Sequence, residues 1–447
     1  MALGQGPPRN LPSRGTTVQA PRSGNCFYTS SPVAPVVQVT FLGGAGEVGR
    51  LTTLIEVSGL RLLFDYGFTA SKPISYPERA PPVDAIFVTH SHLDHSGMVP
   101  EAMRRHQAPV YTTSLTSEIS ELLCLDSIRI ARNDGHPFPY EEGDVENAYR
   151  TTEDVTFGGE VELVGASVRA HSAGHIPGAA MYELKGERST LFTGDISTLA
   201  SRLVNGARPV QCRNLLIEGT YAGREHPDRR ELELELLDRI DDIVYRGGHV
   251  VLPAFAVGRT QEVLLMLQDS GHEVYLDGMG KMVNQIYMDN GDFLRSAGAL
   301  RSADEGVRYV KSEAGRSRAM EADVIVTTSG MLEGGPVGQY IREFAADPRS
   351  AIFLTGYQVE GTAGRKLMDD HVIDIDGATV GLECEVEYFD FSSHAGHPEL
   401  VDFIKRCSPE NVVVMHSDDP KALAFDPELE GFEFVLPENG KAFALPE

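Results

Sequence analysis

The sequence contains no tryptophan, few cysteines and no long apolar run. An odd number of scattered cysteines without a C-x-x-C pair argues against a disulfide framework and against a cysteine zinc ribbon. They are Cys26, Cys124, Cys212, Cys384 and Cys407. No stretch approaches the roughly 18 apolar residues of a membrane-spanning helix, and the first residues lack the basic-then-apolar order of a secretory signal. We therefore expect a cytoplasmic protein with no membrane partner.

Basic residues are also scarce, since 39 lysines and arginines face 65 aspartates and glutamates, for a formal net charge of −26. A protein that binds nucleic acid usually presents a basic footprint. We interpret the acidic excess as adaptation to a salt-rich cytoplasm, because near 1 M salt the Debye length is about 3 Å and a local arginine cluster can still hold a polyanion. This halophilic hypothesis predicts that folding and activity increase in molar KCl.

The length of 447 residues allows about two to three domains of 100–200 residues each. Residues 1–34 are rich in Pro, Gly, Ser and Arg without periodicity, which predicts a flexible arm. Short β-branched runs such as Val161 to Ala170 then predict a strand-heavy α/β layout. From about 209 to 371 strands and helices alternate, which indicates a second α/β domain.

A glycine-rich segment at 43–49 formally contains G-x-G-x-x-G at Gly44, Gly46 and Gly49. A dinucleotide site requires a helix after such a turn. Here the next residues, 51–57, are β-branched and strand-like. We therefore do not interpret the segment as a nucleotide-binding turn.

The densest chemical signal is the segment Thr89-His-Ser-His-Leu-Asp-His-Ser-Gly97, which follows an apolar run. It offers four potential ligands, His90, His92, Asp94 and His95. Imidazole and carboxylate together suit zinc or another late first-row ion, and one ion takes only three or four ligands. Four candidates so close together predict the start of a two-metal site, with further ligands from elsewhere; a solvated polar loop is the alternative.

Further ligands can be sought among the 14 histidines and the aspartates at strand ends. His175, Asp195 and His416 each stand at the edge of an apolar run, and His394 lies in a Ser-Ser-His-Ala-Gly turn. The other histidines have polar or irregular neighbours and are expected at the surface, with His171 and His397 left open between surface and supporting roles. The expected surface histidines are His106, His136, His226, His249, His272 and His371.

Taken in order, Asp65, the His-x-His-x-Asp-His of residues 90–95, His175 and Asp195 resemble the signature of the metallo-β-lactamase superfamily. The segments around Glu218, His394 and His416 resemble the additional motifs of the β-CASP nucleases. Residues 329–336 and 354–362 further resemble short archaeal homologues of the cleavage and polyadenylation specificity factor nuclease, which lack KH domains, and more distantly RNase J.

The resemblance implies an α/β fold, a four-layer αβ/βα metallo-β-lactamase sandwich with an inserted α/β β-CASP domain. The sandwich would occupy residues 35–208 and 372–447, and the insertion 209–371. Two zinc ions per chain are implied. The resemblance gives His90, His92, His175 and Asp195 to the first ion, and Asp94, His95, Asp195 and His416 to the second.

The resemblance also implies the remaining roles. Asp65 supports a ligand or a water, His394 is the general acid, and Glu218 accepts the other N–H of its ring. Two departures affect this assignment, because His416 is followed by Ser-Asp-Asp and His394 by Ala-Gly-His, where an aspartate is usual after the alanine. The metal set is unaffected, whereas the hydrogen bonds around His394 are left open.

RNA must be held by groups outside the metal set. The candidate RNA-binding cations lie beside the motif turns; they are Arg224, Arg259, Arg365 and Lys366. A further candidate, Ser329, begins one of the resembling segments. A helix beginning at residues 258–260 could bind phosphate through its first amides. The alternative is that these cations pair with the abundant carboxylates.

The sequence therefore predicts a zinc-dependent ribonuclease that cleaves internally and trims from the 5′ end as a second mode. A DNA-directed nuclease, a small-molecule hydrolase and a non-catalytic scaffold are the alternatives. RNA is the expected partner, while a homodimer and contacts with the exosome or the transcription-termination machinery are left open.

Overall fold

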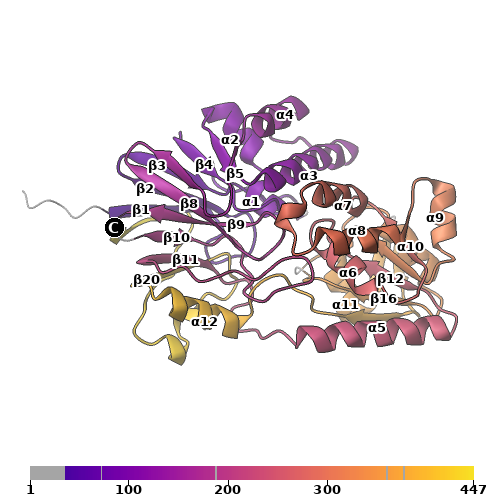
Figure 1. Ribbon diagram of the computed structural model, residues 1–447. Helices are drawn as coiled ribbons and strands as arrows, with labels where there is room; N and C mark the ends of the chain where they lie inside the picture. The colour runs from indigo at the N-terminus through magenta and orange to yellow at the C-terminus, as the bar shows by residue number, and fades with distance from the viewer. Residues whose placement is uncertain (1–35, 72, 187–188, 359–360, 376–377, 447) are drawn as a thin grey trace, which may run out of the picture. The chain divides into compact units, whose positions relative to one another are not determined.

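The computed structural model describes residues 36–71, 73–186, 189–358, 361–375 and 378–446, so the predicted arm at 1–34 lies outside the described residues. Within these ranges the chain forms two seven-stranded sheets, one six-stranded sheet and one two-stranded sheet (Figure 1). None of the helices in these ranges has the length and apolar character needed to cross a bilayer.

The first seven-stranded sheet joins the two ends of the described chain. Its strands follow the order β22 (Ala442–Pro446), β1 (Val36–Gly43), β2 (Thr52–Val57), β3 (Leu60–Phe64), β4 (Ala85–Phe87), β5 (Val110–Thr112) and β6 (Glu153–Asp154). The C-terminal strand β22 pairs antiparallel with β1, with Phe443 opposite Val39. Strands β3, β4 and β5 are parallel, so their carboxyl ends meet at one edge.

The second seven-stranded sheet also combines early and late segments. Its order is β21 (Glu433–Val435), β20 (Asn411–Met415), β11 (Asn214–Glu218), β10 (Thr190–Phe192), β9 (Ala180–Lys185), β8 (Ala166–Ser172) and β7 (Glu160–Leu163). Strands β10, β11 and β20 are parallel, with Leu216 between Phe192 and Val413. This pairing brings the residues after β20 beside those after β10, although they are more than 200 positions apart in the sequence.

The two sheets pack face to face and are covered by helices, which gives four layers. Fully buried Phe64, Phe87, Phe192 and Leu216 belong to the core between the sheets. The outer face of the first sheet packs against α2 (Val99–His106), α3 (Ser114–Asn133) and α4 (Glu142–Arg150), and that of the second against α12 (His397–Cys407). The predicted αβ/βα sandwich is confirmed.

The six-stranded sheet belongs to the second α/β region. Its order is β14 (Val307–Tyr309), β13 (Val274–Asp277), β15 (Val324–Thr327), β12 (Val250–Pro253), β16 (Ala351–Leu354) and β19 (Glu385–Tyr388), and all pairs are parallel. The central strands of a parallel sheet are buried on both faces, which explains the apolar character of β12, β13, β15 and β16. The associated helices are α5 (Arg229–Tyr245), α6 (Arg259–Leu267), α7 (Gly280–Asp289), α8 (Ala297–Glu305), α9 (Glu313–Ala319), α10 (Val337–Phe344) and α11 (Ala363–Asp370).

Shorter elements complete the described chain. They are α1 (Leu93–Ser96), α13 (Lys421–Ala424), the 3₁₀ turns η1 (Gly291–Phe293) and η2 (Pro427–Leu429), and the strand pair β17 (Val372–Ile375) and β18 (Ala378–Gly381).

The sheets to which β11 and β19 belong suggest other limits for the inserted domain than the predicted residues 209 and 371. Strand β11 lies after position 209 but belongs to the second sandwich sheet, and β19 lies after position 371 but belongs to the six-stranded sheet. The boundaries at 209 and 371 stay a prediction, and the sheet membership of β11 and β19 supports a later start and a later end of the insertion. We propose an insertion that runs from about residue 219 to about residue 390.

The glycine-rich turn at 43–49 leads into strand β2 and not into a helix, as the sequence predicts. Gly44 has φ of 83°, and a Cβ atom at this position would lie 2.5 Å from Leu51 Cδ1. Its carbonyl accepts a 2.7 Å hydrogen bond from the backbone N–H of His416. The turn therefore packs tightly against β2 and fixes the backbone of a candidate metal ligand.

Candidate metal centre

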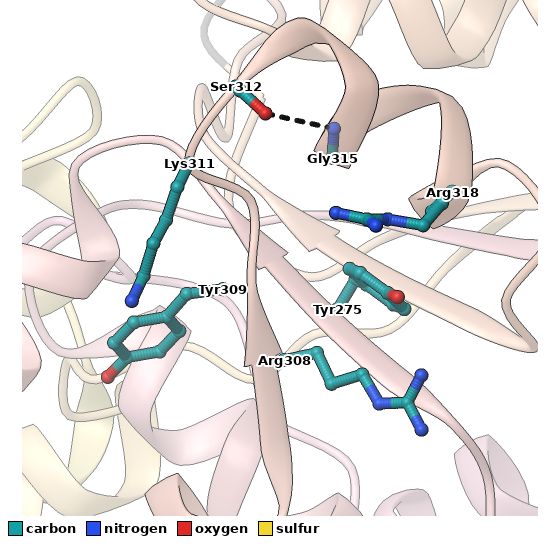
Figure 2. A pocket seen from close by; sticks show the side chains of 7 residues that line it. All are labelled: Tyr275, Arg308, Tyr309, Lys311, Ser312, Gly315 and Arg318. Carbon is teal, nitrogen blue, oxygen red and sulfur yellow. Dashed lines mark hydrogen bonds between the residues drawn. The ribbon is translucent and has the colours of Figure 1, made fainter.

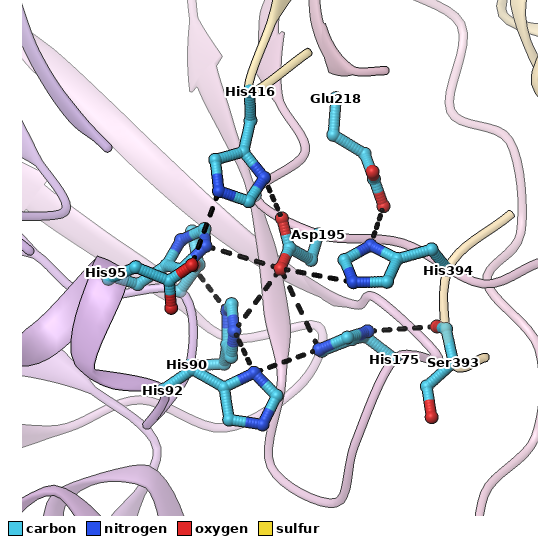
Figure 3. Close-up of polar contacts among 12 residues, drawn as sticks. His90, His92, His95, His175, Asp195, Glu218, Ser393, His394 and His416 are labelled. Atoms are coloured by element: carbon cyan, nitrogen blue, oxygen red, sulfur yellow. Dashed lines mark hydrogen bonds and ion pairs between the residues drawn. The ribbon is translucent and has the colours of Figure 1, made fainter. Parts of the chain in front are cut away.

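The candidate ligands stand where strands of the two sandwich sheets end. Asp65 directly follows β3, His90 is the third residue after β4, and α1 carries Asp94 and His95. In the second sheet Asp195 follows β10, Glu218 ends β11, and His416 follows β20. Since parallel strands end at a common edge, these side chains meet there, and Figure 3 shows His90, His95, Asp195, Glu218 and His416 together.

Three histidines and one aspartate form the first group. His90, His92, His175 and Asp195 each offer one ligand atom, all within 4.8 Å of one another. His92 Nδ1 lies 3.0 Å from His90 Nε2 and 3.2 Å from His175 Nε2. Burial lowers the pKa of His90 and of His175 well below the ordinary value, and lowers the pKa of His92 to about 4. All three rings are therefore neutral near pH 7, as metal coordination requires.

A second group consists of Asp94, His95 and His416. Asp195 joins the two groups, because its Oδ2 lies 3.6 Å from His90 Nε2 and 3.3 Å from His95 Nε2, and its Oδ1 lies 3.1 Å from His416 Nδ1. Burial alone would lower the pKa of His416, but Asp195 and Asp94 outweigh it and raise this pKa to about 10. A cation bound here would take the place of that proton.

Unpartnered polar atoms indicate that both groups fit a metal. In the described part of the chain, His95 Nε2, His416 Nε2 and Asp195 Oδ1 are buried and make no well-formed hydrogen bond, and the groups they approach are other candidate ligands. Leaving such atoms unpaired costs about 1–3 kcal/mol each. Mixed imidazole and carboxylate donors suit zinc, so the residues present fit the ions that the sequence predicts.

Asp65 holds the ligand His95 in place. Its Oδ2 accepts a 2.8 Å hydrogen bond from His95 Nδ1, and its two oxygens also accept from the Thr89 N–H at 2.7 Å and the Thr89 hydroxyl at 2.8 Å. Because Nδ1 of His95 is engaged, its Nε2 faces Asp195. This is the usual way in which a carboxylate fixes the tautomer and orientation of a metal-binding histidine.

His394 lies at the side of the first group. Its Nδ1 is 2.8 Å from Glu218 Oε1, and its Nε2 is 4.0 Å from Asp195 Oδ2. Glu218 is fully buried, and it also accepts from the backbone N–H of Ile196 at 2.8 Å. Burial lowers the pKa of His394, but Glu218 and Asp195 more than compensate and raise it above the ordinary value.

The hydrogen bonds around His394 that the sequence leaves open come from Asp390 and His226. The carbonyl of His394 accepts from His226 Nε2 at 3.2 Å, and His226 Nδ1 bonds Asp390 Oδ2 at 3.1 Å. Asp390 also accepts from the Tyr221 hydroxyl at 3.2 Å, and the ring of Tyr221 stacks on His394 with centroids 6.0 Å apart. Sequence reasoning missed Asp390, whose only signal is its place just before the Ser-Ser-His-Ala motif.

Gly396 occupies the position where an aspartate is usual after the alanine, and His397 follows it. Its ring bridges two other segments, because Nδ1 accepts from the Gly223 N–H at 3.0 Å and Nε2 lies 2.8 Å from Asp426 Oδ2. Its backbone N–H donates to the carbonyl of Arg224 at 2.8 Å. His397 thus has a supporting role.

The surface prediction for the remaining histidines is partly wrong. His136 and His371 are exposed. By contrast, His106, His226, His249 and His272 are half-buried. The polar neighbours of these four histidines in the sequence did not reveal that the fold partly covers their side chains.

The candidate RNA-binding cations differ in their surroundings. Arg259 is only 6% exposed, and its Nη2 donates to Ser393 Oγ at 3.3 Å, while its Nε and Nη1 have no partner among the described residues. Arg365 and Lys366 are paired with Asp369 and Asp374. The expected competition with carboxylates therefore applies to these two, but not to Arg259.

Arg224 and Arg365 line one pocket together with Tyr221, Tyr357 and Asp390. The guanidinium of Arg224 lies 5.5 Å from the centre of the Tyr357 ring. Ser329 and Lys366 do not line this pocket. The structure therefore brings two of the candidate RNA-binding residues beside Tyr221, and hence near His394.

The expected phosphate site at the start of α6 needs correction. The backbone N–H groups of Arg259 and Thr260 donate to the carbonyls of Val257 and Phe255, each at 3.0 Å. These amides are engaged because Gly258, with φ of 80°, folds the preceding loop back under the helix. These two amides are therefore not open to a phosphate, whereas the side chain of Arg259 keeps two nitrogens without a hydrogen-bond partner in the described residues.

Comparison with protein families gives three matches along the chain. Residues 45–276 match the metallo-β-lactamase superfamily, residues 260–367 the β-CASP domain, and residues 379–437 the Zn-dependent metallo-hydrolase RNA specificity domain.

Several archaeal proteins are similar over most of their length. "Probable RNase MJ4" of Methanocaldococcus jannaschii is 34% identical, over 92% of this chain and 100% of its own. "RNase aCSPSF2" of Saccharolobus solfataricus is 34% identical over 94% and 87%. "Transcription termination factor FttA" of M. jannaschii is 32% identical over 87% and 68%.

Among solved structures, a protein of unknown function from Enterococcus faecalis V583 superposes with a TM-score of 0.59. The match covers 92% of this chain and 100% of the other, at 16% sequence identity. At this identity the likeness shows the fold alone.

Proposed function

The chain belongs to the β-CASP family of the metallo-β-lactamase superfamily, which makes it a metal-dependent hydrolase, and on that premise we propose that it is a zinc-dependent ribonuclease. The observation that carries the proposal is the pair of ligand groups joined by Asp195, with His394 and Glu218 beside them. Relatives named RNase support RNA as the substrate.

The residues fit two zinc ions: His90, His92, His175 and Asp195 would hold one, and Asp94, His95 and His416, together with Asp195, would hold the other. Two such ions, when bound, supply a hydroxide nucleophile near neutral pH and neutralise charge on the phosphate. Asp65 keeps Nε2 of His95 directed at Asp195, where it would serve as a ligand.

His394 is the proposed general acid. With Nδ1 bonded to Glu218, its Nε2 carries the proton that the departing ribose 3′-oxygen needs, because an alkoxide is a poor leaving group. Glu218 and Asp195 raise the pKa of His394 above its ordinary value, which favours the protonated ring that this role requires. The products are a 3′-hydroxyl and a 5′-phosphate.

Substrate positioning falls to Arg259 and to the pocket formed by Tyr221, Arg224, Tyr357 and Arg365. The unpartnered Arg259 nitrogens bind a phosphate oxygen close to Ser393, whose carbonyl lies 2.9 Å from His175 Nδ1. Aromatic rings beside guanidinium groups form a stacking platform for the unpaired bases of single-stranded RNA.

Digestion of 5′-labelled RNA tests the proposal. The same sequence is prepared with a 5′-triphosphate and with a 5′-monophosphate, and each is incubated with the zinc-loaded enzyme and with His394→Ala. Internal products from both RNAs indicate endonuclease action, whereas mononucleotides from the monophosphate form alone indicate 5′-3′ trimming. A deoxyribose at the cleavage site distinguishes a DNA-directed nuclease.

No cleavage of any RNA across low and molar KCl, with zinc bound, would refute the ribonuclease. That outcome would instead favour a scaffold role.

A further inference from the structure

A second pocket lies at the edge of the six-stranded sheet, in a segment that carries none of the recognised motifs. It has a volume of about 360 Å³ and is lined by residues of β13, β14, the following turn and α9. They are Tyr275, Arg308, Tyr309, Lys311, Ser312, Gly315 and Arg318 (Figure 2). No member of the metal groups comes from these elements.

The pocket stands across the sheet from the catalytic segment. β14 is one edge strand, and β19, which leads into the turn with His394, is the other. Five strand spacings of about 4.8 Å separate the two edges by about 24 Å. A ligand that occupied both places would be an extended chain.

The charge of the lining contrasts with that of the whole protein. It contains three cations and no carboxylate, although the chain has 65 acidic and 39 basic residues. Arg308 is paired with Glu273. Lys311 and Arg318 are exposed and have no ion pair in the described part of the chain. Unpaired cations on an acidic surface indicate an anionic ligand.

The other lining residues suit a nucleotide more than a bare ion. The Tyr275 ring lies between Arg308 and Arg318, and the Tyr309 ring lies beside Lys311 (Figure 2). The guanidinium of Arg308 is 5.9 Å from the centre of the Tyr275 ring. Tyr275 is buried beneath the guanidinium groups, whereas the half-buried Tyr309 ring and the exposed arginine planes are open to an unpaired base. Unpaired bases stack on such rings and planes, while lysine and arginine bind the backbone phosphates.

We propose that this pocket is an accessory RNA-binding site, which holds a phosphate and base of the same single strand that enters the metal centre. The inference rests on the proposed function for the identity of the polymer. A free nucleotide offers the same chemistry, but the exposed position at a sheet edge lets a longer chain pass through. The site would retain the RNA outside the catalytic cleft.

Binding measurements on the full chain test the site. Lys311→Ala combined with Arg318→Ala is compared with Arg129→Ala combined with Arg132→Ala, a control pair on α3 with side chains 71% and 69% exposed. Both pairs are made in the His394→Ala background to prevent cleavage. The Kd of a labelled 30-nucleotide RNA is measured by fluorescence anisotropy over a KCl series in which circular dichroism shows folded protein.

The pocket pair should weaken RNA binding about tenfold and reduce the slope of log Kd against log[KCl] by about 1.4, since each phosphate contact with a single strand contributes about 0.7. The control pair, with the same loss of charge, should match the His394→Ala parent. Equal Kd values and slopes for the two pairs would overturn the proposal. So would a pocket pair that loses binding of ADP but not of RNA, because the site would then serve a free nucleotide.

Failure of this proposal can be separated from failure of the proposed function. The Kd measurement requires no cleavage. If the pocket pair weakens RNA binding but the zinc-loaded wild-type chain hydrolyses no RNA, the nuclease alone is refuted. If the wild-type chain cleaves RNA but the pocket-pair variant binds RNA with an unchanged Kd, the pocket alone is refuted.

Discussion

Glutamine in place of Glu218 should preserve the shape of the site while removing the charge that holds His394. Glu218 is fully buried, and its Oε1 lies 2.8 Å from both His394 Nδ1 and the Ile196 amide nitrogen. Its other oxygen accepts from the Thr220 N–H at 3.1 Å. A glutamine oxygen can replace only one carboxylate oxygen, so one of these contacts is lost and the imidazolium loses its counter-charge.

The expected loss can be estimated from the contact. A hydrogen bond to a charged group is worth about 1.5–3 kcal/mol. At about 1.36 kcal/mol per factor of ten, the Glu218→Gln enzyme should cleave RNA about 10- to 150-fold more slowly, with RNA affinity unchanged. His394→Ala removes the acid itself and should cost about 10²- to 10⁴-fold.

The assay is single-turnover cleavage of two RNAs that differ at one atom of the scissile bond. One has the natural 3′-oxygen and the other a bridging 3′-sulfur, which departs as a thiolate without needing a proton. If Glu218 acts through the proton on His394, the variant's deficit should nearly vanish with the sulfur substrate.

Glu183→Gln is the matched control, because Glu183 is also buried and also bonds a histidine, His171, at 2.9 Å. It lies on β9, outside the metal groups, and the change should leave cleavage of both substrates at the wild-type rate. An equal deficit of Glu218→Gln on oxygen and sulfur would refute the reasoning, as would the same deficit in Glu183→Gln.

Three further outcomes follow from the same contacts. His416→Ala should lower the zinc content from two ions to one per folded chain by elemental analysis, since it removes a ligand of the second group only; an unchanged content would contradict the assignment. Arg259→Ala should raise the Kd for RNA about tenfold without loss of zinc, and unchanged binding across a KCl titration would contradict it. Burial raises the pKa of Glu183, but His171 and Lys185 outweigh it and bring the pKa to about 2, below the ordinary 4.5. Its stabilisation is therefore present above pH 4.5 and lost as the pH falls through about 2, so the cost of Glu183→Gln in urea unfolding, about 1–3 kcal/mol at pH 7, should shrink in acid.

The metal groups could be predicted from the sequence because their signal is local. Four ligands fall within six positions, and His175, Asp195 and His416 each stand at the end of an apolar run. The carboxyl ends of parallel strands lie at the same edge of a sheet. A potential ligand at such an end can therefore be assigned to that edge even when the neighbouring strand is not known.

The surroundings of His394 could not be predicted in the same way. The bond between His226 and Asp390 joins residues 164 positions apart, and neither stands in a ligand-like pattern. Strand β19, which carries the chain to Asp390, has only four residues and no recognisable boundary. Which sheet it joins depends on pairing with β16, a contact that composition does not specify.

The net charge of −26 and an RNA substrate are compatible because the cations act at short range. Repulsion between the acidic surface and RNA is long-ranged, and it fades when the Debye length falls to about 3 Å near 1 M salt. The exposed contacts of Lys311 and Arg318 weaken under the same conditions, whereas the buried Arg259 is screened much less. In a salt-rich cytoplasm, as the halophilic hypothesis supposes, the balance of binding would therefore move from the sheet edge toward the guanidinium beside Ser393, at the proposed site of cleavage.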